Sequence, residues 1–373
     1  RRVLFRSVVK VFGHEQKVET DFGILNQSLK DKSSKAQFYS GLMMPVMQNL
    51  NTLNYVIITI VGALLAIFRG FDVGGLAAFL QYSRQFGRPI NELASLYNSI
   101  QAAIAGAERI FEIIDEAPEK ADVPEAVTLK NIKGDVALKN VYFGYRPEKT
   151  ILKGVSLHAP AGKKIALVGA TGAGKTTILN LLPRFFDIQS GEITIDNHPI
   201  DRIERNSLRR SMAIVLQDTH LFTGTVRENI RFGRLSATDD EVVAAARLTA
   251  AHSFIKRLPQ GYDTLLENDG ANLSQGQRQL LNIARAAVAD PAILLLDEAT
   301  SNIDTRSEIL IQRGLDQLMQ GRTSLIIAHR LSTIRNADTI LVLEHGEIIE
   351  QGSHQELLAL KGKYYSLNEE QFK

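Results

Sequence analysis

The sequence predicts an α/β domain with a largely parallel sheet, preceded by an all-α part that lies in a membrane. The first observation is a stretch from Ala36 to Phe68 without a charged residue, longer than the roughly 20 residues that span a bilayer as a helix. The second is the alternation of short apolar runs with helical patterns in the last two thirds of the chain. The third is the glycine-rich segment GATGAGKTT, which stands between such a run and a helical pattern.

The composition narrows the class of protein. The 373 residues are enough for two domains, and 43 basic against 41 acidic side chains leave a net charge of +2. Because this charge gives no strong positive field, we expect no nucleic-acid partner. The chain has no cysteine, which excludes disulfides and cysteine-based metal sites. It opens RRVLFRSVVKVFGHEQ without an initiator Met or a signal-peptide core, so we interpret it as the middle of a longer polypeptide.

Residues 1–114 are predicted to form the membrane part. We expect an intracellular loop over about 1–35, a membrane helix over about 41–68, and a last membrane helix with its cytoplasmic extension over about 74–114. The alternative is a buried helix of a soluble protein, but few such helices run so long without charge. Basic residues flank both apolar stretches, so the positive-inside rule places both outer ends in the cytoplasm. These residues are Lys30, Lys32, Lys35, Arg84, Arg88 and Arg109.

A charged segment with two prolines begins at Asp115 and predicts a linker over 115–134, followed by the α/β domain over 135–373. The runs KKIALVG, MAIVLQ, AILLLDE, TSLIIAH and TILVLEHGEIIEQG are predicted strands, most of them typical of strands buried on both faces. A helix is expected directly after Ser274, because Ser274 and Gln277 form an S-x-x-Q capping box.

The segment 169–177 matches the pattern G-x-x-x-x-G-K-[ST] and lies between a predicted strand, 164–168, and a predicted helix, 176–182. This context predicts the P-loop NTPase fold, in which backbone amides surround the phosphates of a nucleotide. Lys175 would lie between the β- and γ-phosphates, and the Thr176 hydroxyl would bind Mg²⁺. The predicted nucleotide-binding residues of this loop are Gly169, Ala170, Thr171, Gly172, Ala173, Gly174, Lys175, Thr176 and Thr177.

The run AILLLDEATSNID predicts a buried strand that ends in a metal-binding carboxylate, Asp297. Glu298 follows past the end of the strand, where its carboxylate can orient a water molecule against the γ-phosphate. The alternative for an adjacent acidic pair is a solvated strand end.

These motifs resemble the nucleotide-binding domain of ATP-binding cassette (ABC) transporters over Val136 to about Gln371. VLQDTHLF resembles the Q-loop with Gln217, SNID the D-loop with Asp304, and IIAHRLS the switch region with His329. The segment VYFGYRPEKTILKGVSL resembles the one that places an aromatic ring, here Tyr145, against adenine. LSQGQ resembles the family's LSGGQ signature, with Leu273, Ser274, Gln275, Gly276 and Gln277.

The resemblance implies that ATP and Mg²⁺ are the cofactors and that two such domains dimerise head to tail. Ser274 and the backbone near Gly276 would then meet the γ-phosphate of ATP bound to the partner. Glu298 would polarise the attacking water, and His329 would stabilise charge on the γ-phosphate. Gln217 would contact Mg²⁺ or water. Thr176 and Asp297 would be metal ligands, and Lys175 would be a catalytic cation.

The first third resembles the end of the membrane half of bacterial multidrug-type ABC exporters. A complete half carries six spans, so the chain resembles an N-terminally truncated half. The implied protein is a subunit of an ATP-driven exporter, multi-pass in the cell (inner) membrane, with its nucleotide-binding domain in the cytoplasm. It would move a small amphipathic, drug-like or lipid-like solute outward. Its expected partners are a second exporter half, the lipid bilayer and the transported small molecule.

Three departures from the commonest family pattern resemble one subunit of the bacterial heterodimeric exporters, and they favour a heterodimer over a homodimer with two active sites. Gln275 stands where Gly is commonest, Asn268 stands where exporters often carry an acidic residue, and SNID replaces a commoner small-small-Leu-Asp. Because Glu298 is present, this chain would contribute the competent carboxylate. Two other functions remain open: a non-transporting ABC ATPase, which typically lacks fused membrane spans, and a regulatory ATP-binding subunit with weak turnover.

Overall fold

The computed structural model describes residues 9–371 apart from 147, 217–218, 298–303 and 329–333. The chain divides into two compact units, Arg1–Glu119 and Lys120–Lys373. Each unit is described by itself.

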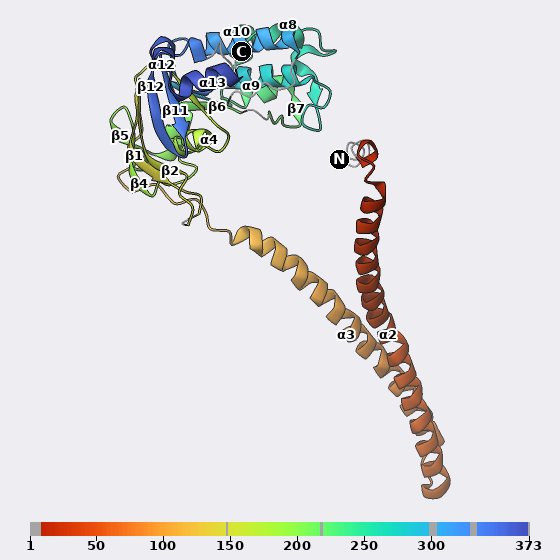
Figure 1. Ribbon diagram of the computed structural model, residues 1–373. Coiled ribbons are helices and arrows are strands. Elements are labelled where there is room, and N and C mark those ends of the chain that lie inside the picture. The colour runs from red at the N-terminus through yellow and green to blue at the C-terminus, as the bar shows by residue number, and fades with distance from the viewer. Residues whose placement is uncertain (1–8, 147, 217–218, 298–303, 329–333, 372–373) are drawn as a thin grey trace. The chain divides into compact units, whose positions relative to one another are not determined.

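The first unit is a hairpin of two long helices, α2 (Glu15–Arg69) and α3 (Val73–Ile114) (Figure 1). Gly70 ends α2 in the left-handed conformation, with φ 69°, which glycine adopts without steric cost. Asp72 caps α3 by accepting a hydrogen bond from the Gly75 amide at 2.5 Å. The turn between the helices is therefore short and fixed at both ends.

Contacts between the two helices fix their register. The Asn54 side-chain amide donates to the Ser83 hydroxyl at 3.1 Å, and the Arg84 guanidinium lies 4.2 Å from the centre of the Tyr55 ring. Nearer the turn, Gly62 lies so close to the end of the Leu76 side chain that a Cβ at this position would displace that side chain. Polar and cation–π contacts thus join the helices beside an otherwise apolar stretch.

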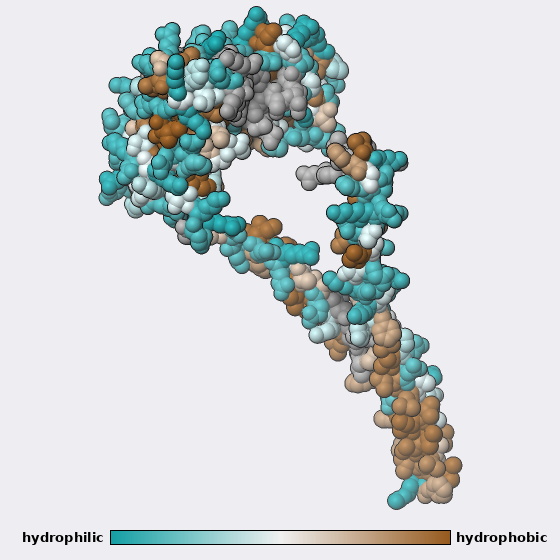
Figure 2. All heavy atoms as spheres, in the orientation of Figure 1, coloured by the Kyte–Doolittle hydropathy of each residue, from teal (hydrophilic) through white to brown (hydrophobic). Residues whose placement is uncertain are grey.

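Helix α2 begins at Glu15, inside the segment predicted as an intracellular loop, and runs without a break through the predicted span to Arg69. Among the helices that the structure describes, α2 alone is long and apolar enough to cross a membrane, and its apolar stretch is almost wholly exposed. Figure 2 shows this apolar surface gathered on the part of the hairpin nearest the turn. Helix α3 is not apolar enough over the length of a membrane span, because its apolar residues are interrupted by Gln81, Arg84, Gln85 and Arg88. The second span therefore stays a prediction.

The second unit is an α/β domain. Its strands are β1 (Val136–Phe143), β2 (Leu152–Ala159), β3 (Lys164–Gly169), β4 (Ser190–Ile195), β5 (His198–Pro199), β6 (Met212–Val215), β7 (Gly224–Thr225), β8 (Leu265–Leu266), β9 (Ile293–Asp297), β10 (Thr323–Ile327), β11 (Thr339–Glu344) and β12 (Glu347–Gly352). Its α-helices are α4 (Lys175–Leu181), α5 (Arg205–Arg210), α6 (Val226–Arg231), α7 (Asp239–Leu248), α8 (His252–Ile255), α9 (Gln275–Ala289), α10 (Thr305–Leu318), α12 (His354–Leu360) and α13 (Lys363–Gln371). Two short 3-10 helices are η1 (Ile200–Arg202) and η2 (Gly261–Asp263).

The main sheet has the strand order β12-β11-β3-β10-β9-β6, and all its pairs are parallel except β11–β12. The prediction of a largely parallel sheet is therefore confirmed. The run TILVLEHGEIIEQG forms two strands instead of one, because His345 and Gly346 turn the chain with φ of 50° and 87°.

Alternate residues of the central strands enter two separate cores. Ile165 and Leu167 pack toward a second, four-stranded antiparallel sheet of order β2-β1-β4-β5, whereas Ala166 and Val168 join the core formed with α9, α10 and other helices. Figure 1 shows β1, β2 and β4 on the side of this unit away from α10. Burial on both faces explains why these strands read as unbroken apolar runs.

Candidate nucleotide-binding site

The glycine-rich loop joins the end of β3 to the start of α4, within one residue of the predicted boundaries. Gly169 has φ 152° and lies against the Leu343 carbonyl of β11, which leaves no room for a Cβ. Gly172 has φ 83° and nothing within 4 Å of a Cβ position. The loop thus needs glycine for close packing at the first position and for left-handed backbone at the second.

Lys175 is buried beneath this loop, with 7% of its surface exposed. Its ammonium donates to the carbonyl oxygens of Gly169 at 2.7 Å and Ala170 at 2.9 Å. Burial lowers the pKa of Lys175, and the charge of Asp297 acts in the opposite direction. The ammonium is therefore fixed at the floor of the loop, within reach of any anion that the loop holds.

Thr176 and Asp297 share a cavity of about 330 Å³ with Lys175 and Gly174. Asp297 ends β9, and across the sheet it pairs in register with Ile327, which in turn pairs with Leu167 of β3. A hydroxyl and a carboxylate are the oxygen ligands that Mg²⁺ accepts beside phosphate groups. The donor set fits Mg²⁺ held partly by a nucleotide, and no cluster of three His, Cys, Asp or Glu side chains able to hold a metal occurs among the described residues.

Tyr145 lies near the same helix. Its hydroxyl is 3.4 Å from the hydroxyl of Thr177, the second residue after Lys175. Tyr145 is 47% exposed, and its ring lies nearly perpendicular to the rings of Phe143 and Phe186, with centroid distances of 5.1 and 5.0 Å. A half-exposed aromatic ring at this place can stack on a planar base whose phosphates occupy the loop.

The signature residues begin a different helix, α9. Ser274 is its N-cap, as predicted, and the capping box is complete: the Ser274 hydroxyl accepts from the Gln277 amide at 3.3 Å, and the Gln277 side chain accepts from the Ser274 amide at 3.0 Å. Ser274 and Gln275 are exposed, whereas Leu273 and Gly276 are buried. None of the described residues lining the P-loop cavity comes from this segment.

Asp304 is the N-cap of α10 and accepts a hydrogen bond from the Ser307 amide at 3.0 Å. Hydrogen bonds from Ser307 lower the pKa of the Asp304 carboxyl. The other predicted catalytic residues, Gln217, Glu298 and His329, lie outside the described residues.

Four described residues at the site were not predicted as site residues. Ile151 and Ile327 line the P-loop cavity, and Phe143 and Phe186 contact the Tyr145 ring. Phe186 follows α4 in the segment PRFFDIQSG, where two adjacent phenylalanines next to charged residues, away from any apolar period, are the signal that could have indicated a role.

The sequence matches the ABC transporter family over residues 152–301 and the ABC transporter transmembrane region over residues 7–90. It is 50% identical to the uncharacterized ABC transporter ATP-binding protein YfiC of Bacillus subtilis, over 98% of this chain and 60% of that protein. It is 47% identical to the fatty acid ABC transporter ATP-binding/permease protein of Mycobacterium tuberculosis, over 97% of this chain and 57% of that protein.

A bacterial Atm1-family ABC exporter, solved with ATP bound, has a similar structure, with a TM-score of 0.84 and 38% identity over 100% of this chain and 65% of that chain. The chain thus spans less than two thirds of the length of these relatives. Both parts of the sequence, and the order in which they follow one another, agree with these matches. The chain belongs to the ABC transporter family, with an ABC transporter transmembrane region fused ahead of an ATP-binding domain, and is homologous to half-size ABC exporters.

Proposed function

We propose that the chain is a subunit of an exporter that binds and hydrolyses ATP at a dimer interface and moves an amphipathic, drug-like or lipid-like solute outward. The observation that supports it most is the cavity that Lys175, Thr176 and Asp297 share, with Tyr145 beside it. This set can bind the phosphates, the metal and the base of one nucleotide. In this proposal, residues 1–114 form the membrane part, residues 115–134 the linker and residues 135–373 the ATPase domain.

The chemistry that these residues perform is positioning and charge stabilisation, which phosphoryl transfer chiefly requires. The Lys175 ammonium would exchange its bonds to loop carbonyls for bonds to phosphate oxygens. Thr176 and Asp297 would hold Mg²⁺, which neutralises phosphate charge when bound. Glu298 would hold and polarise the attacking water, with Gln217 beside the metal and His329 at the γ-phosphate; these three roles rest on the family pattern.

The partner in this proposal is a second exporter half, and a heterodimer is favoured by Asn268 and Gln275. Ser274 and Gln275 are exposed at the start of α9, so their surface is free to meet a nucleotide held by another subunit. Asp304 caps the neighbouring helix α10 and would support the same interface.

We place the protein in the cell (inner) membrane as a multi-pass protein with a cytoplasmic ATPase domain. The apolar, exposed stretch of α2 supports membrane insertion. A relative named as a fatty acid transporter supports the lipid-like class of solute.

The test is ATP hydrolysis by the complete transporter in lipid vesicles. Lys175→Ala should weaken ATP binding, because the buried cation is lost, while Glu298→Gln should keep binding and lower turnover at least about tenfold, or about 1.4 kcal/mol of barrier. Lys153→Ala, which removes an exposed lysine of β2, is the matched control and should leave both properties unchanged.

A fall of much less than tenfold for Glu298→Gln would contradict its role as catalytic base. It would favour a regulatory ATP-binding subunit with weak turnover. Hydrolysis that needs no membrane partner and drives no transport would instead favour a non-transporting ATPase.

A further inference from the structure

Three aromatic rings meet beside the P-loop helix. Phe143 is buried, while Tyr145 and Phe186 are 47% and 42% exposed. Tyr145 is perpendicular to both neighbours, with interplanar angles of 84° and 85°, and Phe143 and Phe186 are themselves 5.9 Å apart. Edge-to-face contacts with two rings restrict the tilt of Tyr145 more than one contact does.

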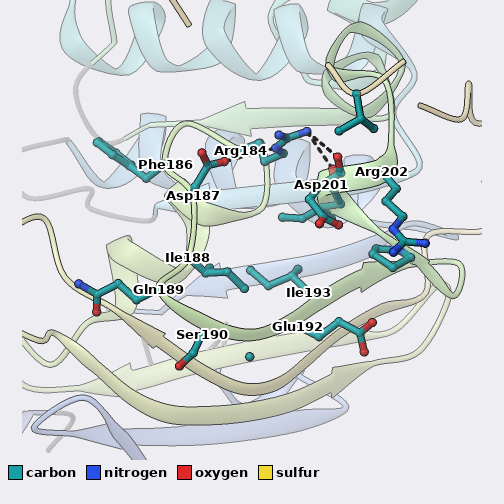
Figure 3. A pocket seen from close by; sticks show the side chains of 14 residues that line it. Arg184, Phe186, Asp187, Ile188, Gln189, Ser190, Glu192, Ile193, Asp201 and Arg202 are labelled. Atoms are coloured by element: carbon teal, nitrogen blue, oxygen red, sulfur yellow. Dashed lines mark hydrogen bonds and ion pairs between the residues drawn. The ribbon is translucent and has the colours of Figure 1, made fainter. Parts of the chain in front are cut away.

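Phe186 belongs to a segment whose backbone is held from several sides. Arg184 takes φ 57°, and its guanidinium donates to the carbonyl oxygens of Ile200 at 3.2 Å and Asp201 at 3.4 Å. Asp187 accepts from the Lys120 ammonium at 2.8 Å. Figure 3 shows Arg184 directed toward Asp201 while Phe186 leads away from it, on the other side of the segment. The residues on both sides of Phe186 therefore fix its position.

A half-exposed tyrosine would otherwise sample several rotamers, and a ligand that stacks on it would have to order it first. The contact with Phe186 orders the Tyr145 ring before the ligand binds, so binding does not have to include this free-energy cost. The Thr177 hydroxyl lies 3.4 Å from the Tyr145 hydroxyl, so the ring is restrained by its contact with Phe186 and, at its hydroxyl end, by α4.

We propose that Phe186 is a positioning residue for recognition of the nucleotide base, which acts by holding the Tyr145 ring in the orientation that stacks on adenine. This inference rests on the proposed function, in which Tyr145 contacts the base of ATP. Phe186 needs no contact with the nucleotide itself.

The test compares two ligands that share the phosphates but differ in the base: ATP and inorganic tripolyphosphate, each with Mg²⁺, bound to the 373-residue chain. Phe186→Ala should weaken ATP binding about three- to tenfold, the scale of one aromatic pair, and leave tripolyphosphate binding unchanged. Phe186→Tyr keeps the aromatic ring, so it should bind ATP about as tightly as the unaltered chain.

The matched control is Phe185→Ala. Phe185 is 50% exposed and lies 5.6 Å from the Arg209 guanidinium, so its removal deletes an equal side chain next door and should leave ATP binding unchanged. In a Tyr145→Ala background, Phe186→Ala should cause no further loss, because its effect passes through the missing ring.

Equal weakening of both ligands by Phe186→Ala, or additive losses in the double variant, would overturn the proposal and leave Phe186 a packing residue. If the unaltered chain binds neither ligand, the proposed function fails with it. Binding of both ligands by the unaltered chain with no selective loss in Phe186→Ala overturns the positioning role alone.

Discussion

Gly169 and Gly172 belong to one loop but are constrained in different ways. At Gly169 a side chain would collide with the Leu343 carbonyl, which pairs with this position in the sheet. At Gly172 a side chain has space, and only the positive φ opposes it. A collision with backbone cannot be relieved by a rotamer change, whereas a left-handed alanine can exist at a moderate cost.

We therefore expect Gly172→Ala to destabilise the ATP-binding unit by about 1–2 kcal/mol and Gly169→Ala by more. Urea unfolding followed by far-ultraviolet circular dichroism measures both. Equal losses for the two variants would show that the Leu343 contact does not constrain the loop.

Some site residues can be predicted from a short stretch of sequence, and others cannot. Lys175 and Thr176 are fixed by nine consecutive residues of one motif, and the strand that carries Asp297 is evident from its apolar run. The Tyr145–Phe186 contact joins segments far apart in the chain, so no local pattern could predict it. Its prediction needs the packing of β1 against the segment after α4.

Among helices and strands, too, the features that were predicted are those whose sequence pattern is short and continuous. The capping box at Ser274 was predicted because both halves of the box lie within four residues. The strands of the main sheet were predicted from apolar runs. The antiparallel sheet was not predicted, because β1 and β2 interleave exposed polar residues with buried ones and so form no unbroken apolar run.

The N-cap of α10 gives a prediction for pH. Hydrogen bonds from Ser307 hold the pKa of Asp304 below its ordinary value of 3.8, so the charged carboxylate stabilises the folded helix end above that pH. This contribution is lost as the pH falls through the lowered pKa. The stability difference between wild type and Asp304→Asn, which caps without charge, should therefore be constant near neutral pH and change only below about pH 4.

Urea midpoints of both proteins across acid pH provide the measurement. A difference that stays constant down to the most acid pH would show that the ionised form of Asp304 does not support the helix.

At the scale of the whole molecule, the P-loop cavity and the exposed start of α9 would contact different nucleotides in the proposed dimer. The P-loop cavity contains Lys175, while Ser274 is exposed at the start of α9. One chain would then hold its own nucleotide with the first surface and its partner's with the second.

Ser274→Arg should accordingly abolish hydrolysis at the partner's site in the complete transporter and leave ATP binding at this chain's P-loop intact. The bulky cation blocks the exposed helix start without reaching Lys175. Ser274→Thr, which keeps a capping hydroxyl, is the control and should retain most activity. Fluorescent-ATP binding and phosphate release measure the two properties, and loss of binding by the Arg variant's own P-loop would contradict this geometry.

Strand β10 lies between β3 and β9, so the glycine-rich loop after β3 and the Asp297 carboxylate at the end of β9 are separated by two strand spacings of about 4.8 Å each. Main-chain hydrogen bonds set that interval, and the apolar side chains filling the core do not. A protein of this fold can therefore change side chains at many positions, as whole-chain identities of 38–50% to its relatives allow, without a change in the backbone interval between these two strands.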